Sequence, residues 1–177
     1  IYLTSVDSPH DVEKCHRWAE MLLNDFDEID RSLALASELF NYLSDVKRIE
    51  NWHLELEKNY QDIENYLRFY NSLNSIYHLL RQRLLSKNTA YTGLAQRLIA
   101  EDLGLIKSWL KEKDKKRIVF IGLDALTMAQ ETIIGHLIKE EICDIFWDSD
   151  EYFINNLEQE SGKFLRKYRK KWPAVLS

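Results

Sequence analysis

The sequence predicts a mainly α-helical protein with a small α/β part: a helical bundle followed by a strand–helix–strand piece of an incomplete parallel sheet. Three observations predict this class. Glycine and proline are scarce, with 5 and 2 residues among 177, whereas a sandwich or barrel needs a sharp turn about every ten residues. Apolar residues recur every three or four positions through the first two thirds of the chain. A β-branched and aromatic run, Ile118–Ile121, then follows a highly charged stretch.

The helical part is justified by apolar spacing and by start and stop residues. Ser8 and Pro9 suit the N-cap and first position of a helix, after an extended-looking opening at residues 2–6. Lys87-Asn88 resembles the end of a long helix, because asparagine tolerates the conformation that ends helices. The spacing predicts helices over residues 9–22, 27–43, 63–84 and 92–102, with Gly104 as an interruption before a further turn or two through Trp109.

The α/β part begins after the charged run at residues 111–117. The composition of Ile118–Ile121 is typical of a strand buried on both faces. Gly122 ends this strand and Thr127 is a suitable N-cap for the next helix. A second strand is predicted over residues 143–147 and a final helix over residues 156–172. Two strands do not form a stable sheet alone, so the remaining strands must come from elsewhere in a parent chain or from a partner. We place the domain boundary between residues 113 and 114.

The composition narrows the classes of function that the chain can have. The formal net charge of −5 and the pI near 5.6 give no global case for nucleic-acid binding. Cys15 and Cys143 lie far apart and indicate neither a disulfide framework nor a zinc site. No apolar run approaches the length of a membrane helix. We therefore expect a soluble, cytoplasmic protein without a membrane partner. Since the chain opens at Ile1 without an initiator methionine, we expect a piece of a longer protein.

One segment could contact a polyanion. Six cations near the C-terminus have no acid between them, and either they complement the dipole of a solvated helix end or they contact phosphate. These candidate nucleic-acid-binding residues are Lys163, Arg166, Lys167, Arg169, Lys170 and Lys171.

The sequence predicts no catalytic residue, cofactor site or metal site. Neither a G-x-x-x-x-G-K-[ST] nor a G-x-G-x-x-G loop is present. The acidic residues at positions 25–30 lack the glycine of a calcium loop and are expected at a helix N-terminus. Asp148, Asp150 and Glu151 follow a strand, where α/β enzymes often hold carboxylates. Capping of the next helix and a metal or catalytic role both stay open for them.

The segment from Arg117 to Thr127, with Gly122, Leu123 and Asp124 at its centre, resembles the part of AddB-type and RecC-type proteins that holds a degenerate second helicase motif. Residues 147–152 and 162–166 resemble the continuation in the Bacteroides-type AddB-like branch. Residues 25–30, 39–40, 45–47 and 90–93 resemble its helical insertion, subdomain 1B. In active relatives the strand ends in Asp-Glu, which holds Mg²⁺ for ATP hydrolysis; here Gly122-Leu123 follows the strand and Asp124 has no adjacent glutamate.

This resemblance implies a non-catalytic, helicase-like fragment of a subunit that processes DNA double-strand breaks. It would act as scaffold and DNA guide in recombinational repair, beside an AddA-like partner subunit, with no cofactor of its own. Full-length relatives often carry a C-terminal PD-(D/E)XK nuclease, which this chain lacks. Two alternatives remain: a metal-dependent nuclease or hydrolase that uses Asp148, Asp150 and Glu151, and a helical protein–protein adaptor.

Overall fold

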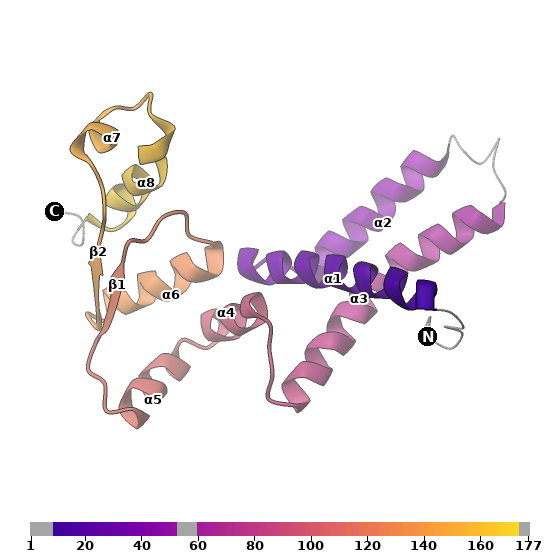
Figure 1. Cartoon of the computed structure of the whole chain (residues 1–177), viewed down its shortest axis with the longest axis horizontal. Helices are drawn as coiled ribbons and strands as arrows, with labels where there is room; N and C mark the ends of the chain where they lie inside the picture. Colours follow the sequence, from indigo (N-terminus) through magenta and orange to yellow (C-terminus); the bar gives the residue numbers. More distant parts are fainter. Residues whose placement is uncertain (1–8, 53–59, 174–177) are drawn as a thin grey trace. The chain divides into compact units, whose positions relative to one another are not determined.

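The computed structural model describes residues 9–52 and 60–173, with side chains described at residues 16–46 and 68–173. The expected opening segment at residues 2–6 and the N-cap Ser8 lie outside these ranges. The structure is mainly helical with one small parallel sheet, as predicted (Figure 1). It forms two compact units that divide between Ala95 and Gln96, called here the helical unit and the sheet unit.

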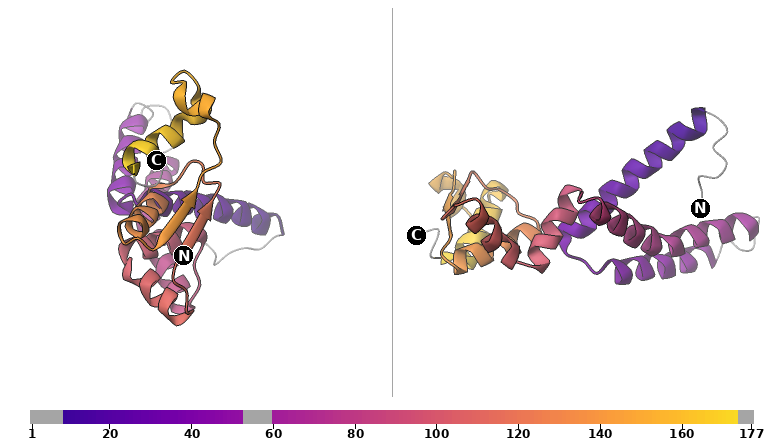
Figure 2. Two further views of the ribbon diagram at one scale, coloured as in Figure 1. Left: turned by 90° about the vertical axis from the view of Figure 1, so that its left-hand side faces the viewer. Right: turned by 90° about the horizontal axis from the view of Figure 1, so that it is seen from below.

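The helical unit is built from α1 (Pro9–Ser32), α2 (Ala36–Trp52), α3 (Tyr60–Ser86) and the first residues of α4 (Thr92–Glu101). The views agree that α2 and α3 lie side by side (Figures 1 and 2). Phe26, Phe40 and Tyr77 form the aromatic centre of the core, and each is at most 5% exposed. The ring centroids of Phe26 and Tyr77 are 5.3 Å apart, in an edge-to-face arrangement that aromatic pairs prefer.

The predicted helix over residues 27–43 is wrong. Residues 27–32 instead complete α1, and a new helix begins at Ala36. Leu33, with a φ of 56°, separates the two. The acidic residues at positions 25–30 therefore lie in the last turns of α1 and not at a helix N-terminus.

A buried carboxylate shows what compensates this charge. Asp30 is fully buried and accepts hydrogen bonds from the hydroxyls of Tyr77, at 2.5 Å, and Tyr91. Asp27 accepts a hydrogen bond of 2.5 Å from the backbone N–H of Gly93. A β-carbon at Gly93 would lie 2.3 Å from the Asp27 carbonyl oxygen, so only glycine fits this approach. These contacts join α1, α3 and the start of α4.

The sheet unit contains the rest of α4 and every described element after it. In chain order these are α5 (Gly104–Glu112), β1 (Ile118–Ile121), α6 (Met128–Lys139), β2 (Cys143–Phe146), α7 (Glu151–Asn155), the 3₁₀ turn η2 (Glu160–Gly162) and α8 (Lys163–Lys171). The strands pair in parallel, with Ile118 opposite Cys143 and Ile121 opposite Phe146. The left view of Figure 2 shows them side by side. This is the predicted strand–helix–strand unit.

The boundary between the units differs from the predicted one. The sequence placed α5 with the helical bundle, but Ile106 and Leu110 of α5 belong to the core of the sheet unit. They share that core with Leu137 of α6 and Ile145 of β2. The apolar face of α5 is therefore buried against the sheet, and the units divide before it.

One face of the sheet is bare, which contradicts the expectation that β1 is buried on both faces. Val119 and Ile121 are 54% and 76% exposed, and Phe146 of β2 is 61% exposed. The opposite face carries Cys143 and Ile145, each at most 9% exposed. Parallel strands are usually covered on both faces, so this sheet has only one of its two layers within the described residues.

The predicted final helix over residues 156–172 begins seven residues late, at Lys163, and ends as expected before Pro173. Asn156 has extended backbone angles, with a ψ of 109°, and ends the short helix α7. Within the ranges the structure describes, no helix combines the length and the apolar character needed to cross a bilayer.

Candidate functional site

The segment that resembles a degenerate helicase motif lies where β1 ends. The Gly122 N–H donates a hydrogen bond of 2.9 Å to the Phe146 carbonyl, which completes the parallel ladder. Gly122 has a φ of +65°, a backbone conformation that favours glycine. The chain therefore turns out of the sheet here, and Asp124 follows as an exposed carboxylate.

The helix that follows begins as predicted. Thr127 is the N-cap of α6, and its hydroxyl accepts a hydrogen bond of 3.3 Å from the Gln130 N–H. The Gln130 side chain accepts one of 2.9 Å from the Thr127 N–H, so the capping box is complete. These side chains satisfy backbone donors at the N-terminus of α6. Helix capping therefore explains the residues that follow the turn after β1.

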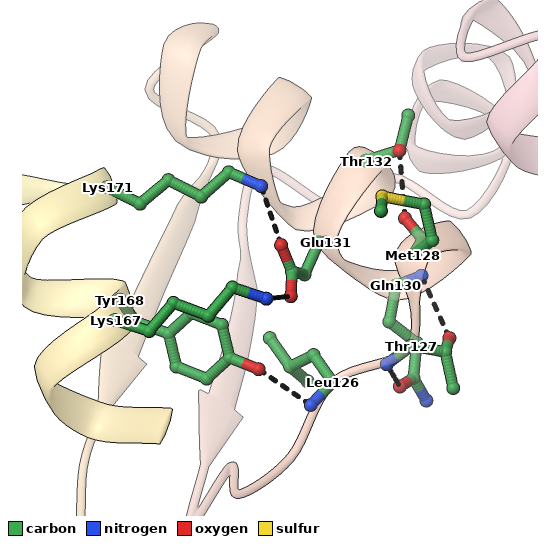
Figure 3. Close-up of polar contacts among 9 residues, drawn as sticks. All are labelled: Leu126, Thr127, Met128, Gln130, Glu131, Thr132, Lys167, Tyr168 and Lys171. Atoms are coloured by element: carbon green, nitrogen blue, oxygen red, sulfur yellow. Dashed lines mark hydrogen bonds and ion pairs between the residues drawn. The ribbon is translucent and has the colours of Figure 1, made fainter. Parts of the chain in front are cut away.

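The six predicted cations of α8 divide into two groups. Lys167 and Lys171 both reach the carboxylate of Glu131 in α6, with the Lys171 Nζ 2.7 Å from Oε2 (Figure 3). Glu131 is 3% exposed, whereas the two lysine side chains are 50% and 43% exposed. These two cations neutralise a buried charge and fasten α8 to α6.

Burial and ion pairing oppose each other at Glu131. Burial raises the pKa of this carboxyl, but hydrogen bonds and charge attraction from Lys167 and Lys171 outweigh it, and the pKa falls below its ordinary value. Beside the pair, the buried Tyr168 hydroxyl accepts a hydrogen bond of 2.7 Å from the Leu126 N–H (Figure 3). Burial raises the pKa of Tyr168. The site therefore holds Glu131 ionised and Tyr168 neutral near pH 7.

Arg166 is also used within the fold. Its guanidinium donates hydrogen bonds to the backbone carbonyls of Phe153, Asn156 and Gln159 at 2.6, 2.9 and 2.7 Å. These carbonyls belong to α7 and to the loop between α7 and η2. Arg166 therefore fixes the connection from α7 to α8.

The second group comprises Lys163, Arg169 and Lys170. All three are exposed, and no hydrogen bond or ion pair joins any of their side chains to another residue in the part of the chain that the structure describes. Lys163 and Lys170 lie two turns apart on α8, which at about 1.5 Å per residue separates them by about 10 Å. Three of the six predicted residues thus present charge to solvent without a competing partner.

The acidic candidates lie between β2 and the start of α7. Asp148, Asp150 and Glu151 are exposed. The Asp150 carboxylate is the N-cap of α7 and accepts a hydrogen bond of 2.7 Å from the Tyr152 N–H. Over the described ranges, no three histidine, cysteine, aspartate or glutamate side chains come together as metal ligands. Cys143 is a buried free thiol. The capping interpretation of Asp150 is confirmed.

The sequence reasoning missed Glu131. A signal was present: Glu131, Ile134 and Leu137 repeat at three-residue intervals, so the glutamate lies on the buried face of α6. Lys167 and Lys171 are four residues apart, so they place two positive charges on one face of α8. A buried acid and a basic pair in one small unit predict an ion pair, because buried charges need partners.

We compared the chain with protein-family models, curated proteins and solved structures, and none of them matches it.

Proposed function

We propose that this chain is a non-catalytic, helicase-like part of a subunit that processes DNA double-strand breaks. In this proposal it serves as scaffold and DNA guide in recombinational repair, next to an AddA-like partner subunit. The observation that carries the proposal is the exposed group Lys163, Arg169 and Lys170 on α8, whose charges have no partner among the described residues. Exposed lysines and arginines on one helix are the usual contacts to a phosphate backbone.

The end of β1 supports the non-catalytic part of the proposal. Gly122 and Leu123 occupy the positions that would follow the strand in a helicase motif, and neither can coordinate a metal through its side chain. Asp124 is exposed, with no acidic neighbour in sequence. The segment from β1 to α6 is a strand, a turn and a helix, but it does not carry the pair of adjacent carboxylates that an active helicase motif has.

Fluorescence anisotropy of a labelled DNA duplex, measured over a series of salt concentrations, tests the DNA contact. The variant Lys163→Ala/Arg169→Ala/Lys170→Ala should lose affinity, and the slope of log K against log salt should fall by about 0.9 for each lost phosphate contact. The matched control is Lys111→Ala/Lys115→Ala/Lys116→Ala, which removes the same charge from exposed positions outside α8. An equal loss in both variants would contradict a contact through α8.

An ATPase assay tests the non-catalytic part. We expect the purified chain to hydrolyse no ATP in the presence of Mg²⁺, with or without DNA. Substantial turnover that Asp124→Asn abolishes would refute the proposal.

The alternatives predict different results in the same assays. Cleavage of DNA that requires Mg²⁺ or Mn²⁺ and is lost in Asp148→Ala would favour the nuclease alternative. A chain that binds no DNA at low salt but forms a stable complex with another protein would favour the helical adaptor. The geometry does not favour the nuclease alternative, because within the described residues no three potential metal ligands come together and Asp150 is used as the cap of α7.

A further inference from the structure

Among the described residues, β1 pairs along one of its two edges. The Ile118 N–H donates to the carbonyl of Ile142, just before β2, at 3.0 Å, and the Gly122 N–H donates to the carbonyl of Phe146 in β2, at 2.9 Å. Because backbone groups alternate along a strand, the N–H and C=O groups of Val119 and Ile121 face the opposite edge. Within the described residues the sheet consists of β1 and β2 and nothing beyond β1. This edge therefore offers a row of free backbone donors and acceptors.

The two edges of the sheet differ. At β2, Arg117 donates a hydrogen bond of 3.1 Å to the Cys143 carbonyl, a group that takes no part in the ladder with β1. Ile118–Ile121 contains neither proline nor a charged side chain, two of the features that protect natural edge strands. Its composition is that of an interior strand. The β1 edge is therefore the side on which the sheet is incomplete.

An apolar groove of about 510 Å³ lies along β1, on the face of the sheet that packs against helices. Ile118 and Phe120 form its strand side, Leu105 and Trp109 of α5 form its opposite side, and Ile133 of α6 contributes to its lining. Leu105 and Trp109 are 48% and 50% exposed. A strand added at the β1 edge would direct every second side chain into this groove.

Charge distinguishes the two ends of the groove. Lys115 and Lys116 are exposed and are separated from β1 by Arg117, and no hydrogen bond or ion pair involves their side chains within the described part of the chain. After β1, Asp124 is the first charged residue. A segment that runs parallel to β1 would place its own N-terminal end near the lysines, where carboxylates are favoured.

We propose that the β1 edge and this groove bind an extended apolar protein segment as a third strand, parallel to β1 and preceded by acidic residues. Free backbone groups supply the pairing, the groove takes alternate aliphatic side chains, and Lys115 and Lys116 fix the direction by charge. The inference is independent of DNA binding by α8.

A synthetic peptide provides the probe. It is acetylated, amidated, and consists of two aspartates followed by alternating valine and threonine; valines facing the groove have the backbone amides that pair with β1. Titrated into the intact chain labelled with ¹⁵N, it should shift the amide signals of Val119 and Ile121 and slow their hydrogen exchange. N-methylation of the valines should weaken binding about tenfold or more, whereas N-methylation of the threonines should not.

Two variants of the chain complete the test. Lys115→Glu/Lys116→Glu should weaken binding of the acidic probe and favour a probe with lysines in place of the aspartates. The matched control, Lys163→Glu/Lys170→Glu, makes the same charge change on α8 and should leave binding unchanged. Equal binding by both N-methylated probes, absence of binding, or saturation of the Val119 and Ile121 amides by self-association of the chain would each overturn the proposal.

Discussion

At the scale of single residues, Glu131 joins the predicted phosphate-contacting helix to the rest of the sheet unit. It is a buried carboxylate whose two partners are half exposed. This asymmetry has an energetic consequence. Removing the acid leaves two lysines that water can solvate, whereas removing the lysines leaves a buried charge without a partner, which costs more.

The first prediction follows from this asymmetry. Lys167→Met/Lys171→Met should destabilise the sheet unit at pH 7, because it leaves the buried Glu131 carboxylate without its charged partners. Glu131→Gln should cost about half as much, since only hydrogen bonds to a charged group are lost. Urea unfolding measures both free energies.

The triple variant with all three changes is the control. It should be more stable than the double lysine variant, because it no longer holds an unpaired carboxylate. A triple variant that is less stable than the double one would show that the lysines contribute through packing alone and not through their charge.

The second prediction concerns pH. The folded-state pKa of Glu131 lies below its ordinary value of 4.5, since the attraction of the two lysines outweighs burial. A depressed carboxyl pKa contributes stability that is complete above the unfolded value and is lost as pH falls through the folded value. The free-energy difference between the wild type and Glu131→Gln should therefore be constant near pH 7 and shrink below pH 4.5. A difference that grows toward acid pH would contradict this assignment.

At the scale of elements, the sequence predicted those whose signals are local. β1 and α6 were confirmed because Ile118–Ile121 is continuously β-branched or aromatic and Thr127 is followed by Gln130 at capping-box spacing. Asn88, with a φ of 53°, ends α3 as expected of a residue that tolerates this conformation.

The errors arose where a tertiary contact overrides the local pattern. The end of α1 carries a buried acid, Asp30, that accepts hydrogen bonds from Tyr77 and Tyr91, which lie far along the chain. The break before α8 depends on Arg166 reaching three backbone carbonyls. No spacing rule within either segment contains this information.

The third prediction compares two glycines. Gly93→Ala should destabilise the helical unit by about 2 kcal/mol or more, because a β-carbon would lie 2.3 Å from the Asp27 carbonyl oxygen and the backbone must move. Gly135→Ala in α6 is the control. Its β-carbon would lie 3.5 Å from the Trp172 side chain, an ordinary contact, and alanine favours a helix interior by about 1 kcal/mol. Thermal unfolding should show a loss for the first variant and no loss for the second.

The sequence predicted which cations make up the candidate site, but not which of them are paired within the fold. The sequence identified all six cations of α8, but it could not separate Lys167 and Lys171 from Lys163 and Lys170, which alternate along the same helix. The distinction depends on where Glu131 lies in the folded unit. Half of the cations in such a run can thus be used in contacts within the fold, although nothing in the neighbouring sequence distinguishes them.

At the scale of the whole molecule, any DNA contact has to act against a net charge of −5. Long-range attraction between the chain and DNA is therefore unfavourable, and binding must come from short-range contacts at the exposed α8 cations. Salt screens both the long-range repulsion and the short-range attraction. The affinity should therefore be set by the small number of phosphate contacts that the α8 cations make.

The fourth prediction addresses nucleotide binding. Since the sequence contains no phosphate loop, ATP with Mg²⁺ should leave the melting temperature of the chain unchanged at concentrations where a specific ligand would raise it. ADP with Mg²⁺ is the parallel measurement. An upward shift that saturates with ATP concentration and disappears in Asp124→Asn would show a nucleotide site beside the end of β1.

The aromatic side chains around α8 provide an optical signal. Trp147, Tyr168 and Trp172 stack in a column, with successive ring centroids 5.5 and 5.3 Å apart and interplanar angles of 24° and 14°. Electronic transitions of rings held so close and nearly parallel couple, which gives strong circular dichroism in the near ultraviolet. The column links the residue after β2 to α8, so undocking of α8 would remove the contribution of the Trp147–Tyr168 pair to this signal. Spectroscopy can therefore follow the attachment of this one helix without any added label.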